Sequence, residues 1–347
     1  MTESAGTAVG DVSYSAVARI GVRPGAVSGI AVTPHGGTLM VTQHADDSVS
    51  SLDTDTCTRS WTLAGVGEPF AIAIAGARAY VSTVSAAYDS ILVIDTGTDR
   101  VIGDYPVAHS VRDLAASPDG RYVYACRAAA LGADVAVIDT AAERVDAISL
   151  TAGGAEPGAI PDCVRVSPDG SRLYVAVQWP TGAELTVIDT NRYRALGTIA
   201  IGPPIRDVAL SPHGDRAYVL GCGTDLGAVV HVVDTGSGAV IGTAKISDVG
   251  GLVTQLTLSR DGERAYLVDD ESVLVLSTHS LGVVDAIAVA DHPSCVVESP
   301  AGDYLYVADY AGTVNVLAIS CTTTAAPLPE EAEVALLELL QGQPALI

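Results

Sequence analysis

The sequence predicts an all-β protein, a seven-bladed β-propeller in which each blade holds four antiparallel strands. Three observations lead to this fold. A turn tetrapeptide with Pro and Gly recurs along the chain, an Asp-Thr pair recurs at intervals of about 42 to 50 residues, and the two chain ends carry complementary parts of one blade. Units of that length with four short strands are typical of propeller blades.

The recurring tetrapeptide predicts the hairpin between the first and second strands of each unit. Proline presets one backbone dihedral and glycine supplies a positive φ, so each copy forms a tight turn. The second unit keeps only Ala75 and Gly76 at this place. The other copies are TPHG at 33–36, SPDG at 117–120 and 167–170, SPHG at 211–214, SRDG at 259–262 and SPAG at 299–302.

Runs rich in Val, Ile, Ala and Tyr complete each unit and predict its four strands. One run precedes the turn, a second follows it, a third ends in Asp-Thr, and a fourth comes last. The Asp-Thr aspartates are Asp53, Asp95, Asp139, Asp189 and Asp234, while Ser277-Thr278 and Ile319-Ser320 fill that place in the last two units. Because an aspartate at a strand end can accept backbone hydrogen bonds in the next turn, this repeat predicts a structural role and not chemistry.

The chain ends predict how the ring closes. The seventh unit has three strands and lacks a fourth, while residues 14–22 (YSAVARIGV) read like a fourth strand that belongs to no unit. Pairing this N-terminal strand with the last blade leaves no open gap between the first and last blades. Residues 1–320 are therefore expected to form one propeller, in which residues 14–22 complete blade seven.

Residues 321–347 lie beyond the repeats and predict a Pro-containing linker followed by a short amphipathic helix. Such a helix is too short to be stable alone in water, so it must bury its leucines, among them Leu336, Leu337 and Leu340. It either docks on its own propeller or binds a partner, which includes self-association with a second copy of the chain.

Composition and charge exclude several classes of partner. The chain has 18 basic and 41 acidic residues, a formal charge of −23, so phosphate backbones and anionic lipid surfaces would repel it. No apolar run is long enough to cross a membrane, and the N-terminus lacks the basic and apolar regions of a signal peptide. We therefore expect no nucleic-acid partner, no direct membrane insertion and a cytoplasmic location. The six cysteines are scattered without a C-x-x-C motif, and we expect no metal and no cofactor.

The hairpin turn, the Tyr-Val that follows it and the Val-Ile-Asp-Thr motif together resemble the YVTN-repeat propellers, also described as YncE-like or lactonase-like. The resemblance spans roughly residues 14 to 320 and implies the seven-bladed fold. Such propellers serve as binding platforms, surface proteins and occasionally enzymes. The Asn of the family motif is replaced in every unit, by Gln43, Thr83, Arg127, Val177, Gly221, Asp269 and Asp309. No catalytic residue is therefore carried over.

The mouth of the central channel is the first candidate site. The first strand of each blade lines this channel, and the longer connections open on one face, here called the loop-rich face. Aligning the first strands gives two equivalent positions per blade near the mouth. The first position holds Ser28, Phe70, Arg112, Asp162, Arg206, Thr254 and Ser294, and the second holds Gly29, Ala71, Asp113, Cys163, Asp207, Gln255 and Cys295.

Arginine offers planar donors to a carboxylate or phosphate, and both Arg112 and Arg206 are followed by aspartate. The residues that predict a ligand-binding mouth are Arg112, Asp113, Asp162, Arg206, Asp207, Gln255 and His292. The alternative is that the arginines and aspartates pair with each other between blades and only complete the funnel.

Aromatic side chains predict a protein interface on the same face. Phe70, Tyr88, Trp179 and Tyr310 fall on or near the loop-rich face, and Tyr and Trp dominate interface hot spots. The alternative for each of them is a cap on a blade end. The leading hypothesis is a non-enzymatic scaffold that binds a protein, for example in an envelope or membrane-protein complex, through this face and the C-terminal helix.

The second hypothesis is a lactonase-like hydrolase or a small-ligand binder at the channel mouth. The chain has no G-x-S-x-G, P-loop, dinucleotide-binding or H-E-x-x-H motif, and His44, His109 and His292 are the histidines that separate blades could bring together for metal or acid–base chemistry. A roomy pocket that contains one of these histidines would favour this hypothesis. A filled channel with an exposed apolar rim would favour the scaffold.

Overall fold

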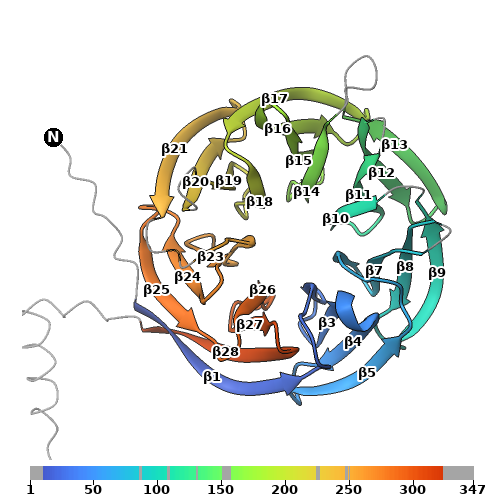
Figure 1. Ribbon diagram of the computed structural model, residues 1–347, viewed down its shortest axis with the longest axis vertical. Coiled ribbons are helices and arrows are strands. Elements are labelled where there is room, and N and C mark those ends of the chain that lie inside the picture. The colour runs from blue at the N-terminus through green and yellow to red at the C-terminus, as the bar shows by residue number, and fades with distance from the viewer. Residues whose placement is uncertain are drawn as a thin grey trace, which may run out of the picture.

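The computed structural model describes residues 11–85, 88–107, 110–129, 132–150, 158–223, 227–246, 249 and 251–322. Within these residues, seven four-stranded antiparallel sheets stand around one central axis, and the predicted all-β, seven-bladed propeller is confirmed (Figure 1). Each sheet runs from an innermost strand at the axis to an outermost strand at the edge of the disc. Besides the strands, the described residues form one short 3-10 turn, η1 (His44–Asp46).

Each blade uses four consecutive strands, except the seventh. From the inside outwards, blade one is β2 (Gly29–Val32), β3 (Thr38–Gln43), β4 (Ser48–Asp53) and β5 (Thr58–Ala64), blade two is β6 (Ile72–Ala75), β7 (Arg78–Thr83), β8 (Ser90–Asp95) and β9 (Arg100–Pro106), and blade three is β10 (Ser110–Ala116), β11 (Tyr122–Ala129), β12 (Gly132–Asp139) and β13 (Arg144–Ser149). Blade four is β14 (Ile160–Val166), β15 (Arg172–Trp179), β16 (Gly182–Asp189) and β17 (Arg194–Gly202), and blade five is β18 (Ile205–Leu210), β19 (Arg216–Cys222), β20 (Ala228–Asp234) and β21 (Ala239–Ile246). Blade six is β22 (Gln255–Leu258), β23 (Arg264–Val268), β24 (Ser272–Ser277) and β25 (Val283–Ala288), and blade seven is β26 (Pro293–Glu298), β27 (Tyr304–Asp309), β28 (Thr313–Thr322) and β1 (Asp11–Gly21).

The tetrapeptide turns join the two innermost strands of a blade on the face opposite the loop-rich face, here called the turn face. The glycine amide donates to the carbonyl of the first turn residue, as from Gly170 N to Ser167 O at 2.8 Å. The Asp-Thr pair stabilises two turns, because its aspartate binds the turn that follows the third strand and its threonine binds the tetrapeptide turn. Asp189 accepts the amide of Arg192 at 3.0 Å, and the hydroxyl of Thr190 donates to Gly170 O at 2.7 Å. The structural role predicted for the Asp-Thr repeat is confirmed.

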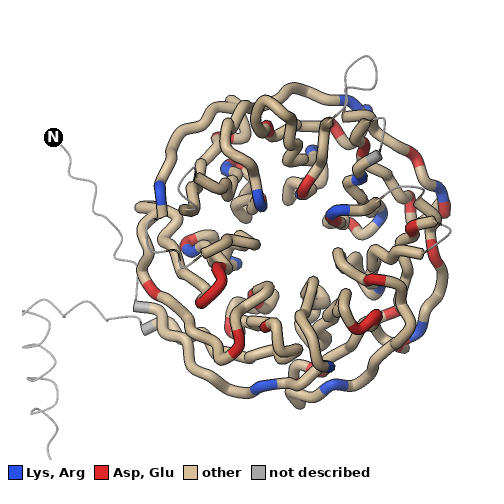
Figure 2. Tube along the Cα trace, viewed as in Figure 1, with Lys and Arg blue, Asp and Glu red and all other residues tan. Residues whose placement is uncertain are grey.

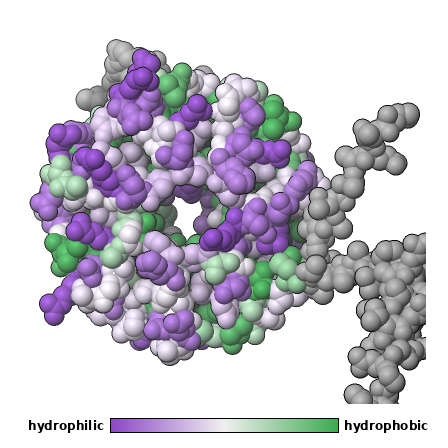
Figure 3. All heavy atoms as spheres, turned by 180° about the vertical axis from the view of Figure 1, so that it is seen from behind, coloured by the Kyte–Doolittle hydropathy of each residue, from purple (hydrophilic) through white to green (hydrophobic). Residues whose placement is uncertain are grey.

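The turns also interlock from blade to blade. The turn glycines Gly170, Gly214 and Gly262 each lie against a proline of the preceding blade's turn. Gly214 has a φ of +72°, and a Cβ added to it would come 2.9 Å from Pro168 Cδ. Glycine is needed there both for its dihedral and for the close approach. Figure 3 shows that this face is largely hydrophilic around the channel opening.

The hydrophobic core lies between neighbouring blades. A tyrosine near the start of the second strand is almost completely buried in several blades, as at Tyr80, Tyr124, Tyr174 and Tyr266. Tyr80 shares one hydrophobic cluster with Leu114 and Val123 of the next blade. Because burying one large apolar side chain stabilises a fold by about 1.5–3 kcal/mol, these clusters couple each sheet to its neighbours.

The N-terminal strand closes the ring, as the sequence predicts. β1 pairs antiparallel with β28, from Asp11 opposite Thr322 to Gly21 opposite Thr313, and both lie in blade seven (Figure 1). The strand begins at Asp11, earlier than the predicted residue 14. Val22, next along the chain, is buried, and its amide donates to Gly312 O at 2.8 Å.

The closing strand also reaches blade six. The Tyr14 hydroxyl donates to the Tyr266 hydroxyl oxygen at 3.3 Å, and the Tyr266 hydroxyl donates to Glu298 Oε2 at 2.7 Å. The Arg260 amide donates to the other carboxyl oxygen of Glu298 at 2.9 Å. Burial raises the pKa of Glu298 against these hydrogen bonds. The seam between blades six and seven therefore contains a buried carboxyl group that is linked to β1.

The C-terminal end of the propeller lies close to its predicted position, since β28 ends at Thr322. The predicted C-terminal helix, with Leu336, Leu337 and Leu340, lies outside the described residues. In the part of the chain that is described, we find no helix of the length and hydropathy needed to span a membrane.

Candidate functional site at the channel mouth

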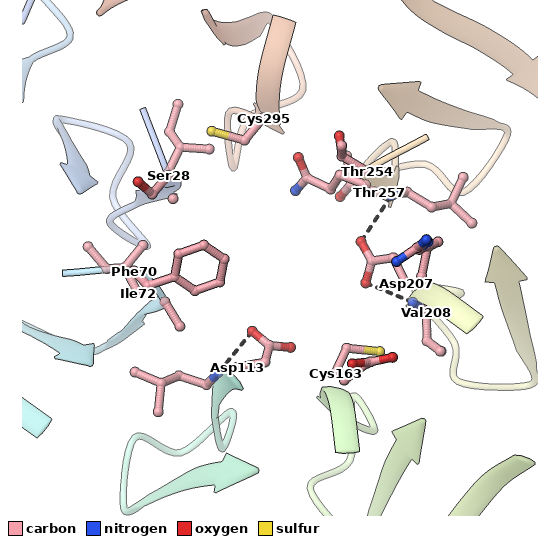
Figure 4. A pocket seen from close by; sticks show the side chains of 18 of the residues that line it. Ser28, Phe70, Ile72, Asp113, Cys163, Asp207, Val208, Thr254, Thr257 and Cys295 are labelled. Atoms are coloured by element: carbon pink, nitrogen blue, oxygen red, sulfur yellow. Dashed lines mark hydrogen bonds between the residues drawn. The ribbon is translucent and has the colours of Figure 1, made fainter. Parts of the chain in front are cut away.

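The inner strands of all seven blades line one cavity of about 1080 Å³ along the central axis. Its lining extends from His44 and Tyr310 on the loop-rich face to Ala116 and Ser259 beside the turn face. Figure 4 shows Phe70 and Asp207 pointing into this space from different blades. Small-molecule pockets have volumes of roughly 300–1,000 Å³, so the channel has room for such a ligand. The filled channel expected of a scaffold is therefore not observed.

The first of the two mouth positions coincides with a β-bulge in four blades. The register between the two innermost strands shifts between Val111 and Asp113 in blade three, and an equivalent shift occurs in blades four, five and seven. The residues left out of the ladder are Arg112, Asp162, Arg206 and Ser294. A bulge re-aims a side chain, and here all four residues line the cavity.

The second position belongs to an ionic network that joins blades three, four and five. Arg165 of β14 donates through Nη1 to Asp113 Oδ2 and through Nη2 to Asp207 Oδ1, both at 2.5 Å. Asp113 lies on β10 and Asp207 on β18, so one guanidinium contacts aspartates of two other blades. Pairing between blades therefore exists, but it is made by Arg165 and not by Arg112 or Arg206.

Side chains at the second position also bind the backbone of the next blade. Asp113 Oδ2 accepts the Val164 amide at 3.0 Å, and Asp207 Oδ2 accepts the Leu256 amide at 2.9 Å. Gln255 repeats this contact toward blade seven, where its Oε1 accepts the Val296 amide at 2.7 Å. These polar side chains therefore fasten one blade to its successor, and their hydrogen-bonding groups are largely used inside the protein.

The charges of this network depend on one another. Burial acts to lower the pKa of Arg165, but the carboxylates of Asp113 and Asp207 outweigh it and hold this pKa well above its usual value. Burial raises the pKa of Asp207, against the opposing effects of Arg165 and the Leu256 amide. The Asp207 side chain is 5% exposed and that of Arg165 is 30% exposed. Removing Arg165 would therefore leave a buried carboxylate without its counter-charge.

Three charged side chains of the first position lie at the mouth without such contacts. We call Arg112, Asp162 and Arg206 the mouth triplet. Arg112 and Arg206 are exposed, and Asp162 is half-buried. Among the described residues, Arg112 and Asp162 make no side-chain hydrogen bond or ion pair, while Arg206 donates from Nε to Cys222 Sγ at 3.1 Å. Figure 2 shows basic residues at the inner ends of β10 and β18 and an acidic residue at that of β14 between them.

On blades one, two, six and seven, the rim of the mouth carries apolar and acidic side chains. Phe70 and Tyr310 are each 50% exposed and Leu252 is 49% exposed, and all three line the cavity. The His44 ring stands edge-on to the Phe70 ring, with centroids 6.4 Å apart. Exposed carboxylates accompany these residues on blades one, two, six and seven, at Asp47, Glu68, Asp270, Glu271 and Asp291.

Other predicted residues lie away from the cavity. His292 is exposed, and its Nδ1 contacts the carbonyl of Asp270. Tyr88 is 49% exposed on the β7–β8 connection. Trp179 is half-buried at the end of β15, and its indole donates from Nε1 to Glu184 Oε1 at 2.9 Å, as expected of a blade-end cap. His109 lies outside the described residues.

Arg165 is the residue of the channel that the sequence reasoning missed. The signal for it was present two residues after the second mouth position, where the seven blades carry Ala31, Ala73, Ala115, Arg165, Ala209, Thr257 and Val297. A single charged residue in an otherwise small or apolar series indicates an ionic contact that the other blades lack. Extending the strand alignment by one further inward-facing position would have found it.

Metal and acid–base chemistry find little support in the described part of the chain. No group of three or more His, Cys, Asp or Glu side chains there is arranged to hold a metal ion. All six cysteines are free thiols. His44 lines the roomy cavity, as the ligand-binding hypothesis requires, but neither it nor His292 contacts a carboxylate side chain.

Known proteins share this architecture. No protein-family model matches the chain. The seven-bladed β-propeller protein Rv1057 of Mycobacterium tuberculosis is 46% identical over an alignment of 349 positions, which spans 91% of this chain and 87% of that protein. Among solved structures, hydrazine synthase of Kuenenia stuttgartiensis matches with a TM-score of 0.74 at 21% identity, covering 87% of this chain and 97% of that chain. At this identity the likeness shows a shared fold alone.

Proposed function

This chain belongs to the family of the seven-bladed β-propeller protein Rv1057, and we propose that it is a non-enzymatic scaffold that binds a protein partner. The partner docks on the loop-rich face around the channel mouth. One observation supports this proposal most. Large apolar side chains that are about half exposed gather on this face, at Phe70, Tyr88, Leu252 and Tyr310.

Such a group of exposed apolar side chains is typical of an interaction surface. Aromatic residues at the centre of an interface contribute most of its binding energy, because a partner removes their large surfaces from water. The turn face is largely hydrophilic around its channel opening by comparison (Figure 3). The outermost strands expose apolar residues as well, such as Ile241 and Val284, but these are distributed around the circumference of the disc.

The charges of the rim indicate the chemistry of the partner. Exposed carboxylates such as Asp47, Glu68 and Asp291 lie on the same blades as Phe70 and Tyr310. A partner surface that combines apolar and basic side chains would complement this rim. The formal charge of −23 would also accelerate the encounter with a basic partner at low ionic strength.

The proposal is tested by quantitative affinity purification from the native host with paired variants. Phe70→Ser with Tyr310→Ser alters the rim, and Ile241→Ser with Val284→Ser removes equally exposed apolar groups from the outer strands. We expect a protein that wild type and the outer-strand control retain and that the rim variant loses. A partner retained equally by both variants, or lost equally by both, contradicts docking at the mouth.

Several finer assignments are part of the same proposal. The partner belongs to an envelope or membrane-protein complex, the protein acts in the cytoplasm, and the tail 321–347 adds a second contact or mediates self-association. Purification without residues 321–347 tests the tail. Kinship with the YVTN-repeat propellers is supported by the recurring turn and the Val-Ile-Asp-Thr motif. The lactonase-like hydrolase is the less favoured alternative, because among the described residues of the mouth His44 contacts no carboxylate side chain.

A further inference from the structure

The mouth triplet is left unexplained by the architecture of the propeller. The polar residues of the second position have structural partners, since Asp113 and Asp207 bind Arg165 and backbone amides, and Gln255 binds the backbone of blade seven. Arg112 and Asp162 have no such partner among the described residues. Their charges therefore contribute little to holding the blades together.

The triplet occupies one equivalent position on three consecutive blades. The other four blades carry the uncharged residues Ser28, Phe70, Thr254 and Ser294 there. In each of the three charged cases the residue sits at the β-bulge of an innermost strand, which turns its side chain toward the cavity. The fold thus places one guanidinium group on each side of a single carboxylate.

These three groups do not neutralise one another. No ion pair joins Asp162 to Arg112 or to Arg206, although all three residues line the same cavity. The contact from Arg206 Nε to Cys222 Sγ leaves the two terminal nitrogens of this guanidinium free to bind a ligand. Both arginines can therefore donate planar, charge-assisted hydrogen bonds, and Asp162 can accept one.

Blade two, next to the Arg112 end of the triplet, adds an apolar surface to the cavity wall. The Phe70 ring points into the cavity, near Ile72 of the same blade (Figure 4). A ligand that spans the channel would thus meet charge on blades three to five and an aromatic ring on blade two. The Ser28 and Thr254 side chains line the cavity on two further blades (Figure 4).

We propose that the mouth triplet binds a small organic acid with a hydroxyl or ammonium group next to its carboxylate and an apolar group at its other end. Arg112 and Arg206 bind the carboxylate, Asp162 accepts the hydrogen bond of the adjacent donor, and Phe70 packs against the apolar group. This site shares Phe70 with the rim proposed for protein docking, but its charged residues lie on blades three to five, whereas Leu252 and Tyr310 of the rim lie on blades six and seven.

Isothermal titration calorimetry with four probes tests this chemistry directly. Phenyllactate and phenylalanine carry the carboxylate, the adjacent donor and the apolar group, while hydrocinnamate lacks the donor and phenethylamine lacks the carboxylate. We expect phenyllactate or phenylalanine to bind about tenfold more tightly than hydrocinnamate, because one charge-assisted hydrogen bond is lost, and phenethylamine not to bind. Equal affinity for the donor-bearing acids and hydrocinnamate, or no saturable binding of any acid, overturns the proposal.

Variants assign the binding to individual residues. Arg112→Ala with Arg206→Ala should weaken binding of the acids by at least about tenfold. Asp162→Ala, which removes the acceptor, should abolish the preference for phenyllactate over hydrocinnamate. Arg100→Ala with Arg194→Ala is the matched control, since both arginines are exposed on the outermost strands β9 and β17. Binding that survives loss of both mouth arginines contradicts the assignment.

The triplet variants distinguish failure of the acid site from failure of the scaffold, whereas Phe70→Ser would affect both. The triplet variants leave Phe70, Leu252 and Tyr310 unchanged, so protein capture by these variants reports on the scaffold alone. Circular dichroism of each variant shows whether a loss of binding reflects unfolding. Retained protein capture with no binding of the acids would overturn the acid site and leave the scaffold standing.

Discussion

The two faces of the disc are built from the same seven units but use their polar groups differently. On the turn face, polar groups bind one another in a pattern that repeats from blade to blade, as in the hydrogen bond from Ser167 Oγ to Asp169 Oδ1 at 2.6 Å. On the loop-rich face, Arg112 and Asp162 have no such partner in the described residues, and Phe70 is half exposed. Repeated polar contacts therefore hold the turn face together, whereas charged side chains on the loop-rich face include a triplet that takes no part in such contacts.

The same contrast appears within the channel. Arg165 and Arg112 both line the cavity, but within the described part of the chain Arg165 contacts two aspartates and Arg112 contacts none. The difference arises from the backbone, because Arg112 stands at a bulge whereas Arg165 follows a regular ladder. Residue type alone does not distinguish a structural arginine from one that can bind a ligand.

Removing β1 should have the largest effect, because both faces depend on a closed ring. Deletion of residues 1–22 exposes the edge of β28 and removes the buried side chains of Ile20 and Val22. We expect a loss of more than about 5 kcal/mol in the free energy of unfolding, measured by chemical denaturation. Deletion of residues 1–10 is the control. If the 1–22 deletion is as stable as wild type, β1 does not close the ring.

A substitution on the turn face should have an intermediate effect. Gly214→Ala places a Cβ 2.9 Å from Pro168 Cδ at a residue with a φ of +72°. We expect a loss of about 2 kcal/mol in the free energy of unfolding, because the substitution combines an unfavourable dihedral with a steric contact. Gly103→Ala on β9 is a matched control, since an added Cβ there has open space. Equal stabilities of the two variants would argue against interlocked turns.

The pH dependence of stability should reveal the buried carboxyl at the turn-face end of the seam between blades six and seven. Burial raises the pKa of Glu298 in the folded protein, so its contribution favours folding below the unfolded-state value of about 4.3 and is lost as pH rises through the folded value. Glu298→Gln should therefore increase stability at neutral pH relative to wild type and flatten the curve above about pH 4.3. The control is Glu271→Gln, at an exposed residue of the loop-rich face. A wild-type curve that rises with pH relative to that of Glu298→Gln would contradict this sign.

Much of the fold could be predicted because it depends on short sequence motifs that recur from blade to blade. A turn such as 167–170 and a strand end such as Asp189-Thr190 are specified by residues that lie close together in the sequence, and six copies of the turn and five of the Asp-Thr pair reinforce one another. Closure by the N-terminal strand could be predicted for the same reason, since the missing fourth strand and the unassigned run have matching patterns.

The candidate site could be predicted only in part, because its contacts join residues that are far apart in the chain. Strand alignment located Arg112, Asp162 and Arg206 at the mouth, but it could not show that Asp113 and Asp207 share Arg165 across three blades. The bulges that re-aim the triplet depend on hydrogen-bond register, which is not visible in residue types. His292 directly precedes β26, a strand that lines the channel, but its ring contacts the carbonyl of Asp270 in blade six.

Chemical denaturation of two arginine variants in one buffer separates the two kinds of channel arginine, those of the mouth that can bind a ligand and Arg165, which belongs to the framework. Arg165→Ala leaves Asp113 and Asp207 without their partner, and we expect a loss of about 3 kcal/mol in the free energy of unfolding. Arg112→Ala with Arg206→Ala should change this free energy by less than about 0.5 kcal/mol. A loss in the double variant as large as that in Arg165→Ala would show that the mouth arginines stabilise the ring, and would contradict their assignment to ligand binding.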